Sequence, residues 1–433
     1  MTDAQVTLWG SNIGAVSWDS TREVAVFQYD PAFVGSGIQV APLMMPLREL
    51  PYEFPALNRE TFWGLPGLLA DSLPDKFGNA IIDAWLAAQG RTRESFNPVE
   101  RLCYVGSRGM GALEFRPALL EPTSSSKTIE VASLVELSNK ILQERSNLHW
   151  TLNGVDDQTA VQDILRVGTS AGGARAKAIL AWNPRTNEFR SGQVNLPPGF
   201  EHWIIKFDGI QNNKDKELAD PQGYGKIEYA YARMALKAGI EMSECRLFAE
   251  GGRSHFMTRR FDRGADGSKV HMQSLCGLAH IDFNTPAIFS YEETLQVMKR
   301  LGLPRTDLEQ QVRRAMFNVV GRNQDDHPKN IAFLMNKSGE WRLSPAFDIS
   351  YSYSPGGYWT RQHQMSLNGK RDGFTREDML ALARLAGIKP RKAADMLEQV
   401  ISAVKTWPQE AADAGVEENR IEKISAVQRI RLS

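Results

Sequence analysis

The chain has 433 residues, a length sufficient for two or three domains with substantial cores. Its 51 Lys and Arg balance its 51 Asp and Glu, so no overall charge favours nucleic-acid binding. It contains no apolar run of about 18 residues to span a bilayer, and its opening "MTDAQVTLWG" lacks the basic start and apolar core of a secretory signal. Three scattered cysteines without metal-binding spacing agree with this pattern, which predicts a cytoplasmic protein without membrane attachment.

The first 120 residues predict an α+β unit. Strand-like segments ("VTLWG", "VAVFQY") are followed by a helix-compatible stretch at 54–90 and by the turn-rich, strand-like "YVGSRGMGALEF". The polar stretch "PTSSSK" then predicts a linker. We expect three units, at 1–120, 121–262 and 263–433.

A loop of small residues at 168–174 precedes an apolar strand-like segment at 178–182. Loops with few side chains let backbone amides approach a bound anion, as in many phosphate sites. The stretch "GTSAGGAR" does not match GxxxxGK[ST], so a Walker-type nucleotide site is not supported. Because small-residue turns are usually only turns, both explanations stay open at this point.

A lysine follows two isoleucines in the strand-like "HWIIKFD". If Lys206 is buried, it needs a carboxylate or a phosphate as partner; an edge strand whose lysine reaches water explains the pattern equally well. The helix-compatible segment 225–240 carries Glu228 in its expected first turn, where the helix dipole already favours a carboxylate. A kinase glutamate that pairs with a strand lysine would lie in the same place.

The segment "SHFMTRRFDR" predicts a strand that leads into a polar turn, and its place between strand-rich and helix-rich regions predicts a hinge. Helices are expected from there on. Ser290 and Thr375 each precede a helical run with acidic residues in its first turn, so both are predicted N-caps. The last fifty residues also predict helices.

The densest group of polar residues is "GRNQDDHPKN", directly before an apolar strand-like run. A capped, solvated turn explains it simply, since Asn, Asp, Pro and Lys all suit loops. A metal hydrolase that uses Asp325, Asp326 and His327 is disfavoured, because adjacent residues rarely point at one ion and no second cluster matches. The GxSxG motif of a nucleophile-elbow hydrolase is absent.

Phosphotransfer makes a sharper demand on spacing. A kinase needs an Asp that orients or deprotonates the hydroxyl, then an Asn five residues later and a second Asp beyond a hairpin to hold Mg²⁺. Asp325 and Asn330 have this spacing, which selects Asp325 over Asp326, and Asp348 follows two strand-like segments joined by a turn at 336–339. The order of small-residue loop, lysine strand, glutamate helix, hinge, polar loop and aspartate is also that of a kinase.

As a set, these segments resemble the HipA-like serine/threonine kinases, the toxins of bacterial type II toxin–antitoxin pairs. The stretches "GTSAGGARAK", "IIKF", "RRFDR", "NQDDHPKN" and "SPAFDIS" are similar to that family's motifs in the same order. "LADSLPDKFG" and "VGSRGMGALEF" resemble its amino-terminal domain, and the resemblance covers roughly residues 5–370. It implies a two-lobed, kinase-like α+β fold with an amino-terminal α+β subdomain and a mostly helical carboxy-terminal lobe.

The resemblance also implies a role for each matching residue. Asp325 would be the catalytic aspartate, and His327 and Lys329 would touch phosphate or substrate from the same loop. Mg²⁺ would be held by Asn330 and Asp348. The implied ATP-binding residues are Lys206, Glu228, Gly172, Gly173, Ala174, Arg260 and Phe261, the last two through their backbone atoms.

Ser170 matches the family's autophosphorylation site, with Thr169 beside it as an alternative acceptor. The resemblance implies that this modification expels the loop and blocks ATP binding, because a phosphate with nearly two negative charges cannot share a pocket made for a triphosphate. Arg175 in "GGARAK" and Gly277 after Cys276 depart from the best-known members, which leaves substrate and nucleotide details open.

The implied activity is transfer of the ATP γ-phosphate to a protein hydroxyl, by resemblance on an aminoacyl-tRNA synthetase, which inhibits translation. The implied partner is a HipB-like helix-turn-helix antitoxin that also binds operator DNA. The chain shows no helix-turn-helix of its own, so we expect contact with DNA only through the antitoxin. Two alternatives stay open: a phosphotransferase with a small-molecule acceptor, and a non-catalytic nucleotide- or antitoxin-binding module, against which retention of Lys206, Asp325, Asn330 and Asp348 argues.

Overall fold

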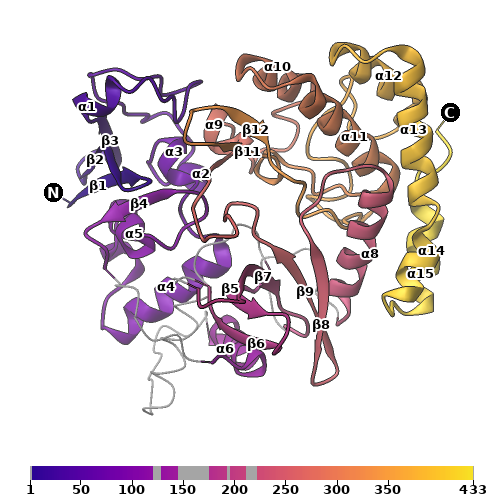
Figure 1. The fold of residues 1–433 in the computed structure, drawn as a ribbon, viewed down its shortest axis with the longest axis horizontal. Coiled ribbons are helices and arrows are strands. Elements are labelled where there is room, and N and C mark those ends of the chain that lie inside the picture. Colours follow the sequence, from indigo (N-terminus) through magenta and orange to yellow (C-terminus); the bar gives the residue numbers. More distant parts are fainter. Residues whose placement is uncertain (1, 120–127, 145–174, 193–195, 211–221, 433) are drawn as a thin grey trace.

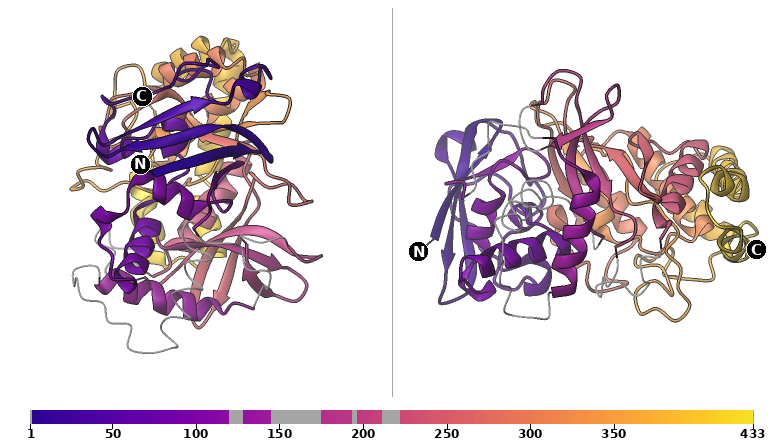
Figure 2. Two further views of the ribbon diagram at one scale, coloured as in Figure 1. Left: turned by 90° about the vertical axis from the view of Figure 1, so that its left-hand side faces the viewer. Right: turned by 90° about the horizontal axis from the view of Figure 1, so that it is seen from below.

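The computed structural model describes residues 2–119, 128–144, 175–192, 196–210 and 222–432 (Figure 1). The described chain forms three antiparallel sheets and a group of helices. Figure 2 shows the amino-terminal sheet at one end of the molecule and the carboxy-terminal helices at the other, with the five-stranded sheet between them.

The amino-terminal sheet has the strand order β3-β2-β1-β4. Its strands are β1 (Thr2–Leu8), β2 (Ser11–Asp19), β3 (Val24–Tyr29) and β4 (Leu113–Arg116), and its helices are α1 (Pro31–Val34), α2 (Arg59–Phe62), α3 (Gly67–Ala70), α4 (Lys76–Ala88), η1 (Arg93–Ser95) and α5 (Pro98–Val105). The strand expected for "YVGSRGMGALEF" is wrong at its start, because Tyr104 and Val105 end α5. Asn97 and Glu100 cap that helix reciprocally, which favours helix over strand there.

The second sheet has the strand order β6-β5-β7-β9-β8. Its strands are β5 (Lys177–Asn183), β6 (Glu188–Ser191), β7 (Glu201–Lys206), β8 (Cys245–Glu250) and β9 (Arg253–Arg259), accompanied by α6 (Val131–Glu144) and α8 (Tyr224–Lys237). Phe77 and Ile81 of α4 lie in one apolar cluster with Trp203 and Ile205 of β7. The segment before residue 120 therefore contributes to two cores, and the domain boundary expected there stays a prediction.

The carboxy-terminal part of the described chain combines a small sheet with eight helical segments. The sheet contains β10 (His271–Ser274), β11 (Ala332–Met335) and β12 (Trp341–Leu343). The helical segments are α9 (Leu275–Ala279), α10 (Tyr291–Arg300), α11 (Arg305–Gly321), η2 (Pro328–Asn330), α12 (Arg376–Leu385), α13 (Pro390–Val404), α14 (Trp407–Asp413) and α15 (Glu418–Val427). In the described part of the chain, no helix combines the length and the apolar character needed to cross a membrane.

The two predicted N-caps are confirmed. The side chains of Ser290 and Thr375 accept hydrogen bonds from the backbone N–H groups of Glu293 and Asp378, and both acidic side chains bond back to the cap backbone. These reciprocal bonds fix where α10 and α12 begin.

The Thr375→Ala change is expected to lower the free energy of unfolding by about 1 kcal/mol, because the Asp378 N–H loses its side-chain acceptor. Urea unfolding followed by circular dichroism measures the change. The control is Ser402→Ala on the exposed face of α13, which is expected to stay within about 0.5 kcal/mol of wild type. Equal effects of the two changes would contradict the capping role.

The predicted hinge after β9 is fastened to the amino-terminal loop that contains Gly109 and Gly111. The buried Asp262 carboxylate accepts hydrogen bonds from the Arg260 and Arg263 guanidinium groups and from the Gly111 N–H at 2.7 Å. Arg260 and Arg263 also donate to the Gly109 carbonyl oxygen at 3.3 and 3.0 Å. Gly111 has φ +74°, and a Cβ there would approach the backbone N of Met272 to 3.0 Å, so only glycine suits the contact. The turn-rich motif of the sequence thus serves as a brace for the hinge.

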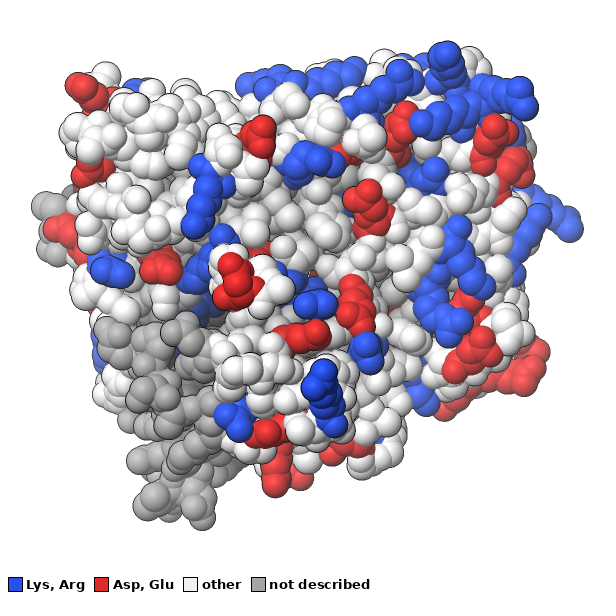
Figure 3. Space-filling model, viewed as in Figure 1, with Lys and Arg blue, Asp and Glu red and all other residues white. Residues whose placement is uncertain are grey.

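Exposed basic side chains gather over the ends of α10 and α12 and the start of α13, along the upper right edge in Figure 3. They include Lys299, Arg300, Arg384, Lys389, Arg391 and Lys392. The balanced total charge is therefore accompanied by an uneven distribution of basic side chains over the surface.

Candidate active site

The polar loop, residues 323–330, follows the end of α11 and holds two adjacent aspartates in opposite environments. The Asp326 side chain is 1% exposed, whereas the Asp325 side chain is 49% exposed. Asp326 accepts hydrogen bonds from the Tyr291 O–H at 2.6 Å and the Gln364 N–H at 2.8 Å, and its Oδ2 lies 2.7 Å from His363 Nδ1. Asp326 thus anchors the loop, and Asp325 projects from it.

The ionisation of Asp326 agrees with an anchoring role. Burial alone would raise its pKa, but the interactions with His363, Tyr291 and the Gln364 N–H outweigh burial and hold that pKa below its ordinary value. An ionised Asp326 keeps all of its acceptor capacity for these donors.

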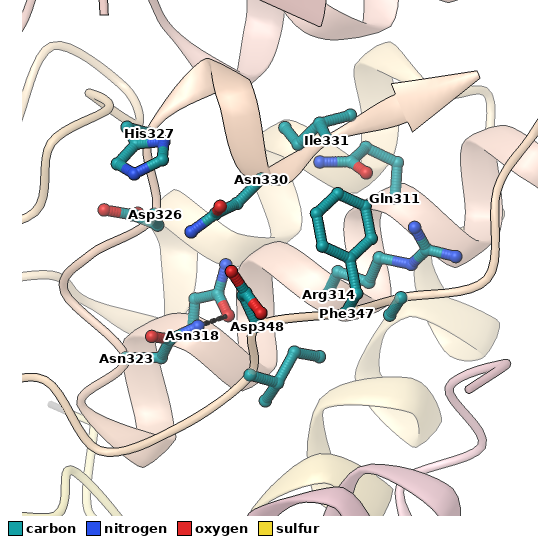
Figure 4. Close-up of a pocket in the computed structure, with 12 residues that line it drawn as sticks. Gln311, Arg314, Asn318, Asn323, Asp326, His327, Asn330, Ile331, Phe347 and Asp348 are labelled. Atoms are coloured by element: carbon teal, nitrogen blue, oxygen red, sulfur yellow. Dashed lines mark hydrogen bonds between the residues drawn. The ribbon is translucent and has the colours of Figure 1, made fainter. Parts of the chain in front are cut away.

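Asn330 and Asp348 face the same cavity (Figure 4). The Asn330 Nδ2 group donates to the Asp325 carbonyl oxygen at 2.8 Å, which fixes the amide and leaves its Oδ1 as the acceptor. Asp348 follows β12 and has φ +52°, a left-handed conformation that is strained for an aspartate. Such strain persists where the surrounding structure requires one side-chain direction, and it often marks a functional site.

Lys206 lies between two carboxylates. Its Nζ is 2.5 Å from Glu228 Oε1 and also bonds Asp348 Oδ1, and only 7% of the residue is exposed. Burial lowers the pKa of Lys206, but the attraction of Asp348 and Glu228 outweighs it and raises that pKa above its usual value. β7 lies between β5 and β9, so the alternative of an edge-strand lysine is wrong.

Glu228 is the fifth residue of α8 and not part of its first turn, which corrects the expectation from the sequence. The helix begins at Tyr224, after Gly223. The dipole of the helix terminus therefore does not account for this carboxylate. Lys206 and Arg175 account for it, because Arg175 Nη1 donates to Glu228 Oε2 at 2.9 Å.

Sequence reasoning missed two charged residues beside this group, Lys177 and Asp75. Lys177 is the cross-strand partner of Lys206 in the β5–β7 pair, so both side chains lie on one face of the sheet. Its Nζ is 3.1 Å from Asp75 Oδ2, and Asp75 is the N-cap of α4. Burial raises the pKa of Asp348, but Lys206 and Lys177 outweigh it and lower that pKa to about 2. Lys177 could have been predicted only from its position opposite Lys206, and that position is known only when the register of the β5–β7 pair is known.

The other predicted residues are distributed around the cavity. His327 lines it, and both the His327 ring and the Lys329 ammonium lie over the Phe283 ring, at 5.4 and 5.2 Å. Gly172, Gly173, Ala174, Ser170 and Thr169 lie outside the described residues.

Arg260 is only partly available for the expected contact with adenine. Its backbone N–H already donates to the His202 carbonyl oxygen at 2.9 Å, and its side chain belongs to the hinge brace. The Phe261 ring lies 5.7 Å from the Phe347 ring and so connects the hinge with the segment that carries Asp348. An adenine contact from this part of the hinge therefore cannot use the Arg260 N–H.

The donor set fits Mg²⁺. Among the described residues, no group of three or more His, Cys, Asp or Glu side chains is placed to hold a metal ion. Asn330 and Asp348 instead offer one amide oxygen and one carboxylate at the same cavity. Mg²⁺ is typically bound through one or two carboxylates together with water and substrate phosphates, so a sparse oxygen set of this kind suits it.

Comparisons with known proteins identify the family of the chain. Residues 4–116 match the HipA N-terminal domain and residues 169–407 match the HipA-like C-terminal domain. A protein of Sinorhizobium fredii named kinase Y4mE is 25% identical over 126 residues; the match covers 27% of this chain and 30% of that relative's length.

Among solved structures, HipA of Shewanella oneidensis MR-1, from a complex of HipA, HipB and operator DNA, aligns with a TM-score of 0.65 and 17% identity. The alignment covers 98% of this chain and 94% of that one, and it confirms the expected two-lobed, kinase-like α+β fold. Because the carboxy-terminal domain match alone spans more than half of the sequence, the chain belongs to the HipA-like family.

Proposed function

We propose that the chain is an ATP-dependent serine/threonine protein kinase. The observation that carries this proposal is the contrast within the polar loop: Asp325 projects from a loop that Asp326 anchors, and Asn330 is fixed to the Asp325 carbonyl oxygen. Lys206, Glu228 and Asp348 form a charged group beside that loop, as phosphotransfer requires.

The proposed chemistry is an in-line displacement. The Asp325 carboxylate orients the acceptor hydroxyl and receives its proton as the oxygen bonds to the γ-phosphorus and the bond to the β-phosphate oxygen breaks, releasing ADP. Lys206 binds phosphate oxygens of the nucleotide, and Glu228 holds the lysine in position. When bound by Asn330 and Asp348, Mg²⁺ neutralises charge on the phosphates.

The acceptor is proposed to be a protein, by family resemblance an aminoacyl-tRNA synthetase whose phosphorylation inhibits translation. A HipB-like antitoxin is the proposed partner, because the Shewanella relative was solved with HipB and operator DNA. Contact with DNA is proposed only through that antitoxin. A small-molecule acceptor remains the alternative, since the same spacing of aspartate, asparagine and second aspartate serves that reaction too.

The Ser170→Ala variant is expected to lose autophosphorylation after incubation with Mg²⁺-ATP. The expectation rests on the family resemblance, in which Ser170 of "GTSAGGARAK" matches the autophosphorylation site. Peptide mass spectrometry locates the phosphate, and Thr169→Ala is the matched control. Phosphate that remains at Thr169 or elsewhere in the Ser170→Ala variant would contradict the assignment of the site.

The proposed function is tested by incubating the protein with a cell extract and Mg²⁺-ATP and mapping all new phosphosites. New phosphoserine or phosphothreonine on an extract protein, absent with Asp325→Asn, would support a protein kinase. A labelled metabolite without any labelled protein would favour the small-molecule acceptor.

A further inference from the structure

The carboxy-terminal segment after α15 is linked to the polar loop by Arg429, which contacts His363, the residue that contacts Asp326. The Arg429 N–H donates to the Val320 carbonyl oxygen at 2.9 Å near the end of α11, and the Arg322 Nε donates to the Val427 carbonyl oxygen at 2.8 Å. These two bonds place the segment beside the point where α11 leads into the polar loop. The family match ends at residue 407, so it does not include Arg429.

The Arg429 side chain meets the histidine that contacts Asp326. Its Nη1 lies 3.1 Å from His363 Nε2, its Nη2 donates to Asp372, and its guanidinium lies 5.4 Å from the centre of the Phe374 ring. The guanidinium is thus held on three sides, and the Arg429 side chain is 10% exposed. His363 is fully buried, and its other ring nitrogen, Nδ1, lies 2.7 Å from Asp326 Oδ2.

Hydrogen-bond chemistry decides which nitrogen of His363 carries the proton. A guanidinium only donates hydrogen bonds, and an ionised carboxylate only accepts them. His363 Nε2 must therefore accept from Arg429, while Nδ1 carries the hydrogen and donates it to Asp326. Turning the ring over would place carbon atoms against both partners, so the ring orientation is fixed by the same argument.

We propose that Arg429 is a positioning residue for the polar loop: by donating to His363 Nε2 it holds the ring in the orientation that presents Nδ1–H to Asp326. The backbone then transmits the effect to the reacting groups, because Asp325 directly precedes Asp326 in the chain and its carbonyl oxygen fixes the Asn330 amide at 2.8 Å. The catalytic consequence rests on the proposed kinase function, whereas the tautomer does not. A small displacement of a positioned group lowers the chemical rate steeply, while binding contacts elsewhere are unaffected.

The test compares Arg429→Met with Arg429→Lys, which retains a donor, and with Arg431→Met on the exposed end of the same segment. Long-range ¹H–¹⁵N spectra of the full chain identify the tautomer of each of its seven histidines, and the His363 signals are assigned by their loss in His363→Asn. Wild type and the lysine variant are expected to show Nδ1–H at His363 with a hydrogen-bonded, unprotonated Nε2. In the methionine variant the ¹⁵N shift of Nε2 is expected to move to that of a nitrogen without a donor, while Nδ1–H remains. The rate constant of autophosphorylation at saturating ATP is expected to fall about tenfold in Arg429→Met. The half-saturating ATP concentration is expected to stay unchanged, and Arg431→Met is expected to behave like wild type.

The wild-type spectra test the contact between Arg429 and His363 Nε2 even if Arg429→Met fails to fold. An Nε2–H tautomer in the wild-type protein overturns the proposal. An unchanged ¹⁵N shift of His363 Nε2 and an unchanged rate in a folded Arg429→Met also overturn it. A wild-type protein that transfers no phosphate while the Nε2 shift responds to Arg429→Met overturns the proposed function and its catalytic consequence, and supports the contact itself.

Discussion

The Asp325→Asn variant is expected to lose phosphotransfer activity by about 10³-fold, because the change removes the group that orients and deprotonates the acceptor hydroxyl. The fold depends little on this carboxylate, since its side chain is 49% exposed and the nearest nitrogen of the His327 ring, Nε2, is 3.7 Å away. The free energy of unfolding is therefore expected to stay within about 0.5 kcal/mol of wild type. Initial rates of ³²P transfer from Mg²⁺-ATP and urea unfolding measure the two quantities.

Asp326→Asn is the matched control for this prediction. It replaces a carboxylate that is 1% exposed and accepts from Tyr291, Gln364 and His363, so the free energy of unfolding is expected to fall by about 1–3 kcal/mol. A wild-type rate in Asp325→Asn would refute its catalytic role. Equal destabilisation by both changes would refute the division between a projecting and an anchoring aspartate.

The Lys206→Met variant is expected to lose phosphotransfer by about 100-fold or more, because it removes a cation from the proposed phosphate site. It also leaves the Asp348 carboxylate without its closest cation and Glu228 with only Arg175, so the free energy of unfolding is expected to fall by about 3 kcal/mol. The rate of ³²P transfer and KM for ATP measure the first effect, and urea unfolding measures the second.

Lys423→Met, on an exposed face of α15, controls for loss of a lysine and is expected to change neither quantity. A folded Lys206→Met variant with unchanged KM and rate would show that Lys206 is only a structural cation. Loss of stability together with a raised KM would place the lysine at the nucleotide.

Much of the fold followed from local patterns in the sequence. The capping signals at Ser290 and Thr375 act within one helical turn, so they could be recognised without knowing the tertiary structure. The start of "YVGSRGMGALEF" was misjudged because Tyr104 and Val105 suit a strand locally, while Asn97 had already capped a helix upstream.

The sequence predicted those site residues whose spacing within one short segment is typical of a kinase. It did not predict residues that come together only when distant segments pack. The five-residue step from Asp325 to Asn330 selected the aspartate that projects from the loop. Lys177 and Asp75 were missed because their proximity depends on strand register and on the packing of α4. Arg429 was missed for the same reason, since its contact with His363 spans 66 residues of sequence.

The most direct test of the central claim is to incubate the purified protein with Mg²⁺ and ATP labelled with ¹⁸O in its γ-phosphate, and to compare it with Asp325→Asn by mass spectrometry. The proposed kinase function predicts ¹⁸O-labelled phosphate on a serine or threonine of the wild-type chain and none on the variant. Labelled phosphate on both proteins at equal levels, or on neither with a cell extract added, would contradict it.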